Sequence, residues 1–297
     1  MKKSASLYII FASVIWASLG IFGTEMSKIG FTSLQISSLR VTGAAIFFVL
    51  TMLFTDKSRF KVNIKDLWLF FLMGFGCILG MSVLYFYTLV NTSLPVASIL
   101  LYTSPIWVII ISAIVFREKI TRQKIAALIC AFAGCVMVSL NGGEAGKIQV
   151  WFFITGLLSG LAYGMYSILG TFALKKYHPY TVTTYSFIFA AVFSWFIANP
   201  ADTIMVAAVY PDKFTAIMWM VLVGFVTSYL AFMFYTIGLE NTPPGKAAVM
   251  ACTDPLMSTL LGFFVYGQKP SVIGMALIFF AILLVNNFGI NKQKNTL

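Results

Sequence analysis

One carboxylate stands out because it falls near the middle of a long apolar stretch. Asp254 lies within residues 246–266, in the sequence Cys252-Thr253-Asp254-Pro255. If that stretch crosses a bilayer, a charge there costs from about 2.5 to more than 10 kcal/mol, so it faces a wet cavity, pairs with a cation or is protonated. Pro255 also frees a backbone carbonyl about one turn earlier. Asp254 suits amine recognition or proton coupling, and the alternative is a protonated carboxyl that hydrogen-bonds the backbone of a neighbouring helix.

Arg40 is the second charge inside an apolar stretch, at residues 33–54. Its guanidinium could act as a clamp for a ligand carboxylate. The alternative is a structural contact with loop carbonyls, or a side chain that extends to the nearer membrane interface. Lys246 differs, because it begins the stretch at 246–266 and lies close to Glu240 in the sequence. We expect Lys246 to extend to the interface or to pair with Glu240 there.

Further polar and aromatic side chains fall near the middle of apolar stretches: Ser104, Tyr102, Trp16, Tyr163, Tyr85 and Tyr235. Trp and Tyr usually collect at the membrane interfaces instead. A hydroxyl group in mid-bilayer needs a hydrogen-bond partner, which a polar cavity supplies. Ser104 precedes Pro105 just as Asp254 precedes Pro255. Lining of a central pathway is one interpretation of these residues, and plain helix packing is the other.

Cysteine and histidine are too few and too scattered to indicate a metal centre. The cysteines lie in apolar stretches without the paired spacing of a zinc site, and we interpret them as small buried apolar residues: Cys77, Cys130, Cys135 and Cys252. His178 is the one histidine, which excludes an HExxH centre, and the sequence has no nucleotide-binding P-loop. It therefore predicts neither a metal nor another cofactor.

The composition indicates which elements must position these residues. Of 297 residues, 60% are hydrophobic and 10% are charged, against about 25% charged in a typical soluble domain. This excludes a water-soluble globule. Apolar windows between charged or Gly, Pro and Asn breaks predict ten membrane-spanning helices, each able to cross a core about 30 Å thick. They are residues 7–26, 33–54, 67–89, 95–116, 123–140, 151–174, 180–199, 215–238, 246–266 and 271–290.

The basic residues predict the orientation of the ten spans. With a cytoplasmic N-terminus, the inner segments hold 14 Lys and Arg residues and the outer segments hold 4. Arg40 and Lys246 are left out, because they lie within or at the edge of spans. The positive-inside rule therefore places both termini in the cytoplasm. The formal net charge of +11 is a topology signal, so the sequence predicts no nucleic-acid partner.

The two halves of the chain resemble one another. A shift of 150 residues aligns spans three to five with spans eight to ten without a gap, and the matched pairs include Gly74 with Gly224, Tyr85 with Tyr235, Asn91-Thr92 with Asn241-Thr242, Thr103 with Thr253, and Pro105 with Pro255. A shift of 147 pairs Trp16 with Tyr163. Each half, at residues 5–141 and 150–290, holds five spans. An odd number per repeat inverts the second copy, and inverted repeats can open a central site to alternate sides.

Glycines on the predicted sixth span favour close helix packing. Gly156, Gly160 and Gly164 form consecutive small-xxx-small steps on one face. Gly74 and Gly76 are candidates for the same role in the third span. Hinge behaviour is the alternative for all of them.

The whole chain, from about residue 5 to 290, resembles the EamA-type members of the drug/metabolite transporter superfamily. The matching features are Trp16-Ala-Ser, Arg40, Tyr102-Thr-Ser-Pro105, Glu118, and Cys252-Thr-Asp-Pro255. The resemblance implies two five-helix repeats around a central cavity and a secondary transporter, often an exporter of amino acids or other small metabolites. The chain departs from the family at Gly267-Gln268, where Gly-Glu is common, so a role for a carboxylate there is confined to Glu118.

Together these features favour a gradient-driven carrier that exports a small metabolite such as an amino acid, with proton coupling as an option. Import of a nutrient or cofactor-like metabolite, including a cationic one, is the alternative. An embedded enzyme would need a nucleophile–base pair or metal ligands, and a channel would need repeated charges or a filter segment; the sequence predicts neither. We expect a small-molecule substrate, the lipid of the plasma membrane, and either a monomer or a homodimer.

Overall fold

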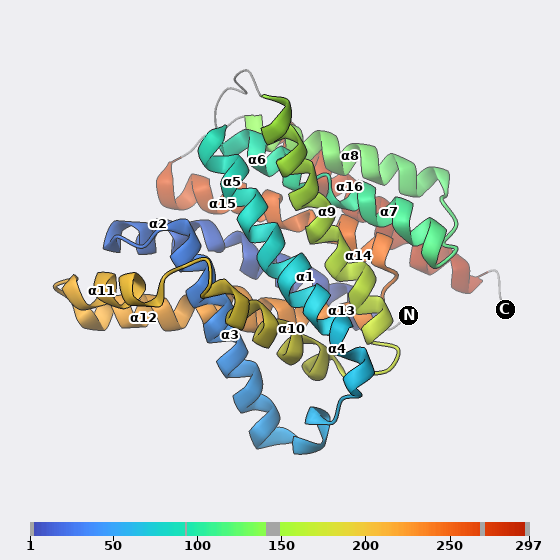
Figure 1. Cartoon of the computed structure of the whole chain (residues 1–297). Coiled ribbons are helices and arrows are strands. Elements are labelled where there is room, and N and C mark those ends of the chain that lie inside the picture. The colour runs from blue at the N-terminus through green and yellow to red at the C-terminus, as the bar shows by residue number, and fades with distance from the viewer. Residues whose placement is uncertain (1–2, 93, 141–148, 268–270, 295–297) are drawn as a thin grey trace.

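The computed structural model describes residues 3–92, 94–140, 149–267 and 271–294, and these form helices without a β-strand (Figure 1). This confirms the all-α prediction. The α-helices are α1 (Lys3–Ala17), α2 (Leu19–Ile29), α3 (Ser33–Thr55), α4 (Leu67–Phe71), α5 (Met81–Asn91), α6 (Leu94–Leu101), α7 (Ser104–Val115), α8 (Arg122–Leu140), α9 (Val150–Ala173), α10 (Pro179–Ser194), α11 (Pro200–Val209), α12 (Lys213–Gly224), α13 (Ala231–Glu240), α14 (Pro244–Ala251), α15 (Thr253–Tyr266) and α16 (Val272–Lys294). The remaining helices are two 3-10 helices, η1 (Lys57–Phe60) and η2 (Ile64–Asp66), and two π-helices, η3 (Leu72–Gly80) and η4 (Phe225–Leu230).

Seven helical segments of the described chain are long and apolar enough to cross a membrane. They coincide with predicted spans one to four, six, eight and nine: Ala5–Ile29, Ser33–Thr55, Ile64–Asn91, Val96–Val115, Val150–Ala173, Lys213–Glu240 and Pro244–Val265. Helices α8, α10 and α16 occupy the other three predicted spans. Of these, α10 has 16 residues, which is about 24 Å of helix for a core of about 30 Å. These segments confirm a multi-pass helical membrane protein. Seven of the ten predicted spans are long and apolar enough to cross a membrane.

The segment after α10 differs from the expectation. The sequence predicts a span over 180–199, whereas α10 ends at Ser194 and a further helix, α11, starts at Pro200. The Asn199 side chain accepts a hydrogen bond from the Ala201 amide at 3.0 Å, and proline fits the first helical position. Local capping therefore starts a helix in a segment that the apolar pattern leaves unassigned.

Three spans are broken near the middle, and two of the breaks have the same cause. Helices α6 and α14 end at Leu101 and Ala251. Each of these residues lies four positions before a proline, Pro105 or Pro255, which lacks the amide that would bond its carbonyl. The two breaks are 150 residues apart, as are the ends of the π-helices η3 and η4. The third break, at Ser18 between α1 and α2, has no counterpart in the continuous helix α9.

Helix α9 packs closely against the break between α6 and α7 because its facing residues are glycines. A Cβ at Gly160 would lie 2.5 Å from Thr103 Oγ1 and 2.6 Å from the Leu100 carbonyl oxygen. At Gly156 and Gly164 the nearest atoms of the same two helices would be 2.3 and 2.8 Å away. No side chain fits these gaps, so the packing interpretation of this stripe is confirmed.

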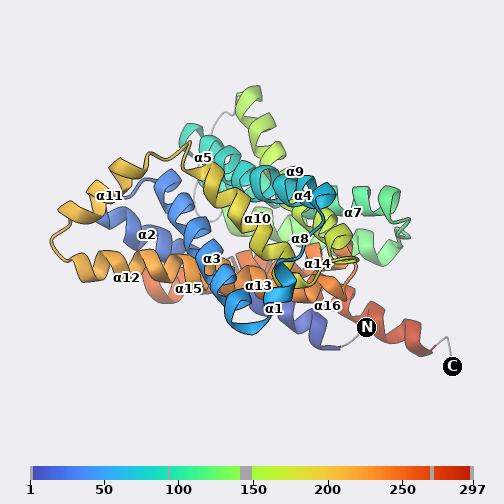
Figure 2. The ribbon, with the colours of Figure 1, turned by 60° about the horizontal axis from the view of Figure 1, so that its bottom comes forward.

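The bundle is apolar outside and holds polar residues inside, which is the distribution expected in lipid. Phe54, Phe196 and Phe264 are 85%, 81% and 77% exposed, whereas Arg40 and Ser104 are buried. All four cysteines are free thiols, and three of them are buried. Helix α1 starts and α16 ends at the same end of the bundle (Figures 1 and 2).

Candidate binding cavity

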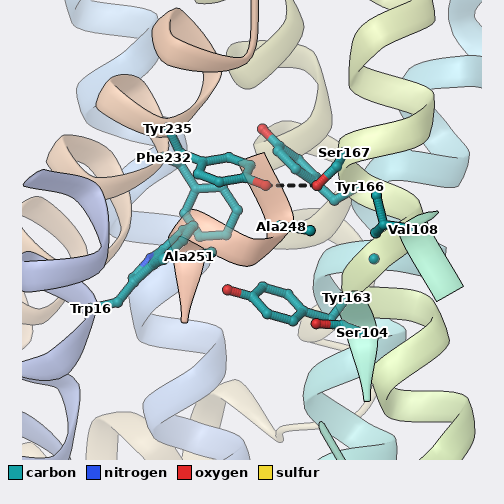
Figure 3. Close-up of a pocket in the computed structure, with 11 residues that line it drawn as sticks. Trp16, Ser104, Val108, Tyr163, Tyr166, Ser167, Phe232, Tyr235, Ala248 and Ala251 are labelled. Carbon is teal, nitrogen blue, oxygen red and sulfur yellow. Dashed lines mark hydrogen bonds between the residues drawn. The ribbon is translucent and has the colours of Figure 1, made fainter. Parts of the chain in front are cut away.

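A cavity lies inside the bundle where the broken helices meet α1, α9 and α13. Residues of five helices line this small cavity: Trp16, Ser104, Val108, Tyr163, Gly164, Tyr166, Ser167, Phe232, Tyr235, Ala248 and Ala251 (Figure 3). Ser104 is the first residue of α7, and Ala251 is the last of α14. The two proline-induced breaks thus border this cavity, and the glycines of α9 let that helix come close enough to form its wall.

One wall of the cavity consists of hydroxyl groups that already have partners. The Ser167 and Tyr235 hydroxyls lie 2.7 Å apart, and those of Tyr166 and Thr236 lie 3.0 Å apart; Figure 3 shows the first pair. Both hydrogen bonds join α9 to α13. These groups need no ligand, so this wall is a fixed boundary between the two helices.

Two other hydroxyl groups in the cavity have no such partner. Within the described parts of the chain, neither the Tyr163 nor the Ser104 hydroxyl makes a hydrogen bond with another residue. The Tyr163 hydroxyl points across the cavity on the side of Trp16 (Figure 3), whose ring meets that of Tyr163 edge-on at 6.2 Å. Because an unpaired hydroxyl in an apolar medium is unfavourable, these groups can bind water or a polar ligand.

Trp16 is the centre of the aromatic part of the cavity. Its ring centroid lies 5.0 Å from that of Phe232 and 5.2 Å from that of Tyr235, in addition to the contact with Tyr163. The residues paired by the sequence repeat, Trp16 and Tyr163, are therefore in contact in space. This arrangement places aromatic rings next to the unpaired hydroxyls.

Asp254 lies in the first turn of α15 and is not among the residues that line the cavity. Its carboxylate accepts a hydrogen bond from the Ser258 hydroxyl at 3.1 Å, and it is within electrostatic range of Tyr85, Tyr102 and Tyr163. Among the described residues it has no cationic partner. It also makes no hydrogen bond there with the backbone of a neighbouring helix, as the structural alternative requires.

Arg40 is buried, with 8% of its surface exposed, and its Nε atom has no hydrogen-bond partner. It lies within electrostatic range of Tyr163. In the described structure no hydrogen bond joins its guanidinium to a loop carbonyl.

The eight candidate residues divide into three groups in the structure. Trp16, Ser104, Tyr163 and Tyr235 line the cavity. Tyr85 and Tyr102 lie outside that lining but within electrostatic range of Asp254, and Arg40 lies within electrostatic range of Tyr163. Tyr163 lines the cavity and lies within electrostatic range of both Asp254 and Arg40.

Sequence reasoning missed several residues of the cavity wall. Tyr166 and Ser167 follow Tyr163 by three and four positions, so helical periodicity places them on the same face of α9. That spacing was the available signal. Phe232 lies three residues before Tyr235 on α13 and is found by the same rule.

Lys246 does not form the expected ion pair with Glu240. It is 9% exposed, and among the described residues it pairs with no acidic side chain. Glu240 accepts a hydrogen bond from the Asn241 side chain instead, at 3.4 Å. The two residues lie on different helices, α13 and α14, so their closeness in sequence does not bring them together.

A polar network joins the loop between α3 and α4 to the loop between α9 and α10; we call it the basic end. Asp66 accepts hydrogen bonds from the Lys176 ammonium and the Tyr177 hydroxyl. These hydrogen bonds lower the pKa of Asp66, and the bond to Asp66 raises the pKa of Lys176. The Asn63 amide donates to the Tyr177 hydroxyl at 3.2 Å, and Thr181 donates to the Arg59 carbonyl at 3.0 Å. The two halves of the chain are thus tied together by their loops.

Helices long and apolar enough to cross a membrane, packed around polar residues in the middle of the bundle, define a multi-pass membrane protein. The sequence profile of the EamA-like transporter family matches residues 3–140 and 150–287. The chain therefore belongs to this family, with two copies of its domain, as the sequence resemblance predicts. Membership points to a transporter with a small-molecule substrate rather than to an enzyme.

Known proteins support this assignment over the whole chain. An uncharacterized transporter of Archaeoglobus fulgidus is 26% identical, over 85% of this chain and 88% of its own length. The uncharacterized transporter YyaM of Bacillus subtilis is 22% identical, covering 95% and 93%. A protein of Streptantibioticus cattleyicolor named "probable terminal-alkyne amino-acid exporter" is 21% identical, covering 99% and 97%. A solved crystal structure has the same fold, with a TM-score of 0.81 at 17% identity over 97% of this chain and 98% of that one.

Proposed function

We propose that the protein is a gradient-driven secondary transporter that exports a small metabolite, such as an amino acid, through the central cavity. The observation that carries this proposal is that the Tyr163 and Ser104 hydroxyls of the cavity make no hydrogen bond among the described residues, and that the Asp254 carboxylate has no cationic partner among them. Polar groups without partners inside a membrane are costly, and a polar substrate would compensate for that cost when it binds. The amino-acid exporter among the relatives supports the substrate class and the direction.

Alternating access is the mechanism that we propose for this carrier. The breaks at Leu101 and Ala251 come from equivalent positions of two repeats, and both border the cavity. Ten spans with five in each repeat would make the repeats inverted, so that two equivalent packings open the cavity to opposite sides. In this scheme the cavity moves the substrate across without a nucleotide, driven by a gradient.

The orientation proposed for the carrier places the basic end and both termini in the cytoplasm of the cell that bears it in its plasma membrane. Its support is the excess of Lys and Arg in the predicted inner loops. Thiol labelling of single cysteines introduced at 57–65 and at 175–178 tests this topology, with labelling of both segments expected from the cytoplasmic face. Labelling of the two segments from opposite faces would contradict the ten-span arrangement.

Transport in liposomes tests the function and the role of Asp254 together. We expect the reconstituted protein to show counterflow of an amino acid. If Asp254 binds the substrate, Asp254→Asn lowers this counterflow about tenfold or more, since one charged hydrogen bond contributes about 1.5–3 kcal/mol. The matched control is Asp202→Asn at the exposed start of α11, which should transport normally.

A second readout separates the two roles of the carboxylate. If Asp254 couples transport to protons, Asp254→Asn abolishes transport driven by a pH gradient but leaves counterflow intact. If Asp254 binds the substrate, both fall. Unchanged rates in both assays would remove Asp254 from the mechanism, and the absence of counterflow with any metabolite would contradict the carrier itself.

A further inference from the structure

We propose that Glu118 is a positioning residue for α14, the half-helix of the second repeat whose last residue lines the cavity. Its carboxylate takes the place of the side-chain cap that the start of α14 lacks. Glu118 belongs to the first repeat, so one repeat holds a cavity-lining element of the other. The inference goes beyond the proposed function, because the position of α14 can be measured without a substrate.

The start of α14 lacks the local hydrogen-bond acceptor that usually caps a helix. Its N-cap residue is Pro243, whose side chain accepts no hydrogen bond. Gly245 and Lys246 are buried, yet their amides make no hydrogen bond among the described residues. Unpaired amides in the first turn of a helix carry partial positive charge, and burial makes them unfavourable. A negative group close to this turn therefore stabilises α14.

Glu118 supplies a negative group at this turn. A Cβ placed on Gly245 would lie 3.3 Å from Glu118 Oε2 and 3.4 Å from Ile109 Cγ1 of α7. Because Gly245 has no side chain, the carboxylate and α7 both lie directly against the first turn of α14. The side chain of Glu118 is 16% exposed, and a carboxylate near a helix N-terminus is more stabilising where it is partly buried.

An ion pair and a turn of the backbone hold the carboxylate in this place. Lys124 of α8 donates to Glu118 Oε2 at 2.6 Å. The chain before Glu118 turns through Arg117, whose φ of 54° lies in the left-handed region that a residue with a side chain rarely adopts. The Glu118 amide then donates to the Ser112 carbonyl at 3.3 Å. Such a backbone conformation persists where the surrounding contacts enforce it, so the position of Glu118 is fixed from both sides.

In sequence, the second repeat does not carry this charge. The shift of 150 residues that aligns the repeats pairs Glu118 with Gln268 and Gly245 with Pro95. Gln268 is neutral, and it lies outside the described residues. The same shift pairs α14 with α6, the half-helix at the other proline break. Helix α6 is therefore an internal control for α14 within the same protein.

The position of the start of α14 affects the cavity because this helix has only 8 residues. Ala248 and Ala251 line the cavity, and Cys252 follows directly at the break. The Cys252 thiol is a free thiol in a residue that is 3% exposed, and it donates to the Ala248 carbonyl at 3.7 Å. A reagent reaches this thiol only when the end of α14 moves, so Cys252 reports on the position of the helix.

Hydrogen exchange of the purified protein measures the local opening of α14. Glu118→Gln keeps the size of the side chain and removes its charge. We expect it to lower the protection of the α14 amides about fivefold, which corresponds to the loss of one helix cap, and to leave α6 unchanged. In a background of Cys77→Ala, Cys130→Ala and Cys135→Ala, it should accelerate the alkylation of Cys252 by a similar factor.

A local cap tests whether the missing charge is the cause. Pro243 is exposed and has no amide hydrogen, so Pro243→Asp adds a capping side chain without the loss of a backbone hydrogen bond. In the Glu118→Gln protein, Pro243→Asp should restore the protection of α14 and the slow alkylation of Cys252, whereas Pro243→Ala should not. Lys124→Gln removes the ion pair but leaves the carboxylate, so it should lower α14 protection less than Glu118→Gln.

Several results would overturn the proposal. Unchanged α14 protection in Glu118→Gln would remove the cap, and an equal loss in α6 would show general destabilisation instead. Failure of Pro243→Asp to restore protection, or an equal loss in Lys124→Gln, would show that the charge does not act on the helix start. Counterflow is a separate readout: its absence in wild-type protein contradicts the carrier and leaves the exchange result valid.

Discussion

Gly160→Ala tests whether close packing of α9 against the α6–α7 break positions the cavity. The added Cβ would lie 2.5 Å from Thr103 Oγ1 and 2.6 Å from the Leu100 carbonyl oxygen. The carbonyl is backbone and cannot rotate away, and the Thr103 hydroxyl donates to it at 2.6 Å. The helices must therefore separate, or this hydrogen bond must break.

The magnitude follows from two opposing effects. Overpacking in a tight interior costs about 1–3 kcal/mol, whereas Ala in place of Gly inside a helix gains about 0.5–1 kcal/mol. We expect a net loss of about 1–2 kcal/mol in the free energy of unfolding in mixed detergent micelles. Because Ser104 directly follows Thr103 at the break, ligand binding in the cavity should weaken as well.

Gly23→Ala is the matched control, because a Cβ at Gly23 in α2 would meet nothing within 4 Å. There the helix-propensity gain acts alone, so stability should be unchanged or slightly higher. A Gly160→Ala protein as stable as wild type would refute the packing argument. An equal loss in Gly23→Ala would show that any added methyl group destabilises this bundle.

Two further predictions concern polar pairs. A double-mutant cycle of Tyr235→Phe and Ser167→Ala should give a coupling of about 0.6 kcal/mol, the mean for hydrogen bonds between membrane helices, and at most about 1.7 kcal/mol. Zero coupling would mean that the 2.7 Å contact contributes nothing. At the basic end, Asp66→Asn should lower thermal stability at neutral pH. The pKa of Asp66 is lowered by folding, so its contribution is present above the unfolded value of about 4 and is lost as pH falls through the folded pKa. The pKa of Lys176 is raised, so its contribution is lost only as pH rises above about 10.4. A difference between Asp66→Asn and wild type that disappears near pH 7 would contradict this assignment.

The apolar pattern and the repeat account for most of the fold that could be predicted from the sequence. Long apolar runs leave a helix as the stable way to satisfy the backbone in lipid, so the helices follow from composition alone. The effect of Pro105 and Pro255 is also local in sequence, because each lacks the amide that would hydrogen-bond the carbonyl four residues earlier. Helix α11 was not predictable from apolar windows, because its start depends on the capping side chain of Asn199.

The sequence by itself determined which side chains are costly inside a membrane. Asp254 and Arg40 stand out in any arrangement of the helices, because their charges fall inside apolar stretches. The same reasoning treats Tyr163 and Tyr235 as equivalent, since both lie near the middle of a span. Sequence position alone does not distinguish them.

Only the tertiary structure decided which hydroxyl is available to a ligand. The partner of Tyr235 is Ser167, 68 residues away in the chain. Tyr163 instead meets the Trp16 ring and has no hydrogen-bond partner among the described residues. A hydrogen bond between helices depends on how they pack and rotate against each other. That arrangement is set by glycine contacts and helix breaks distributed along the whole chain, so no local segment contains the information.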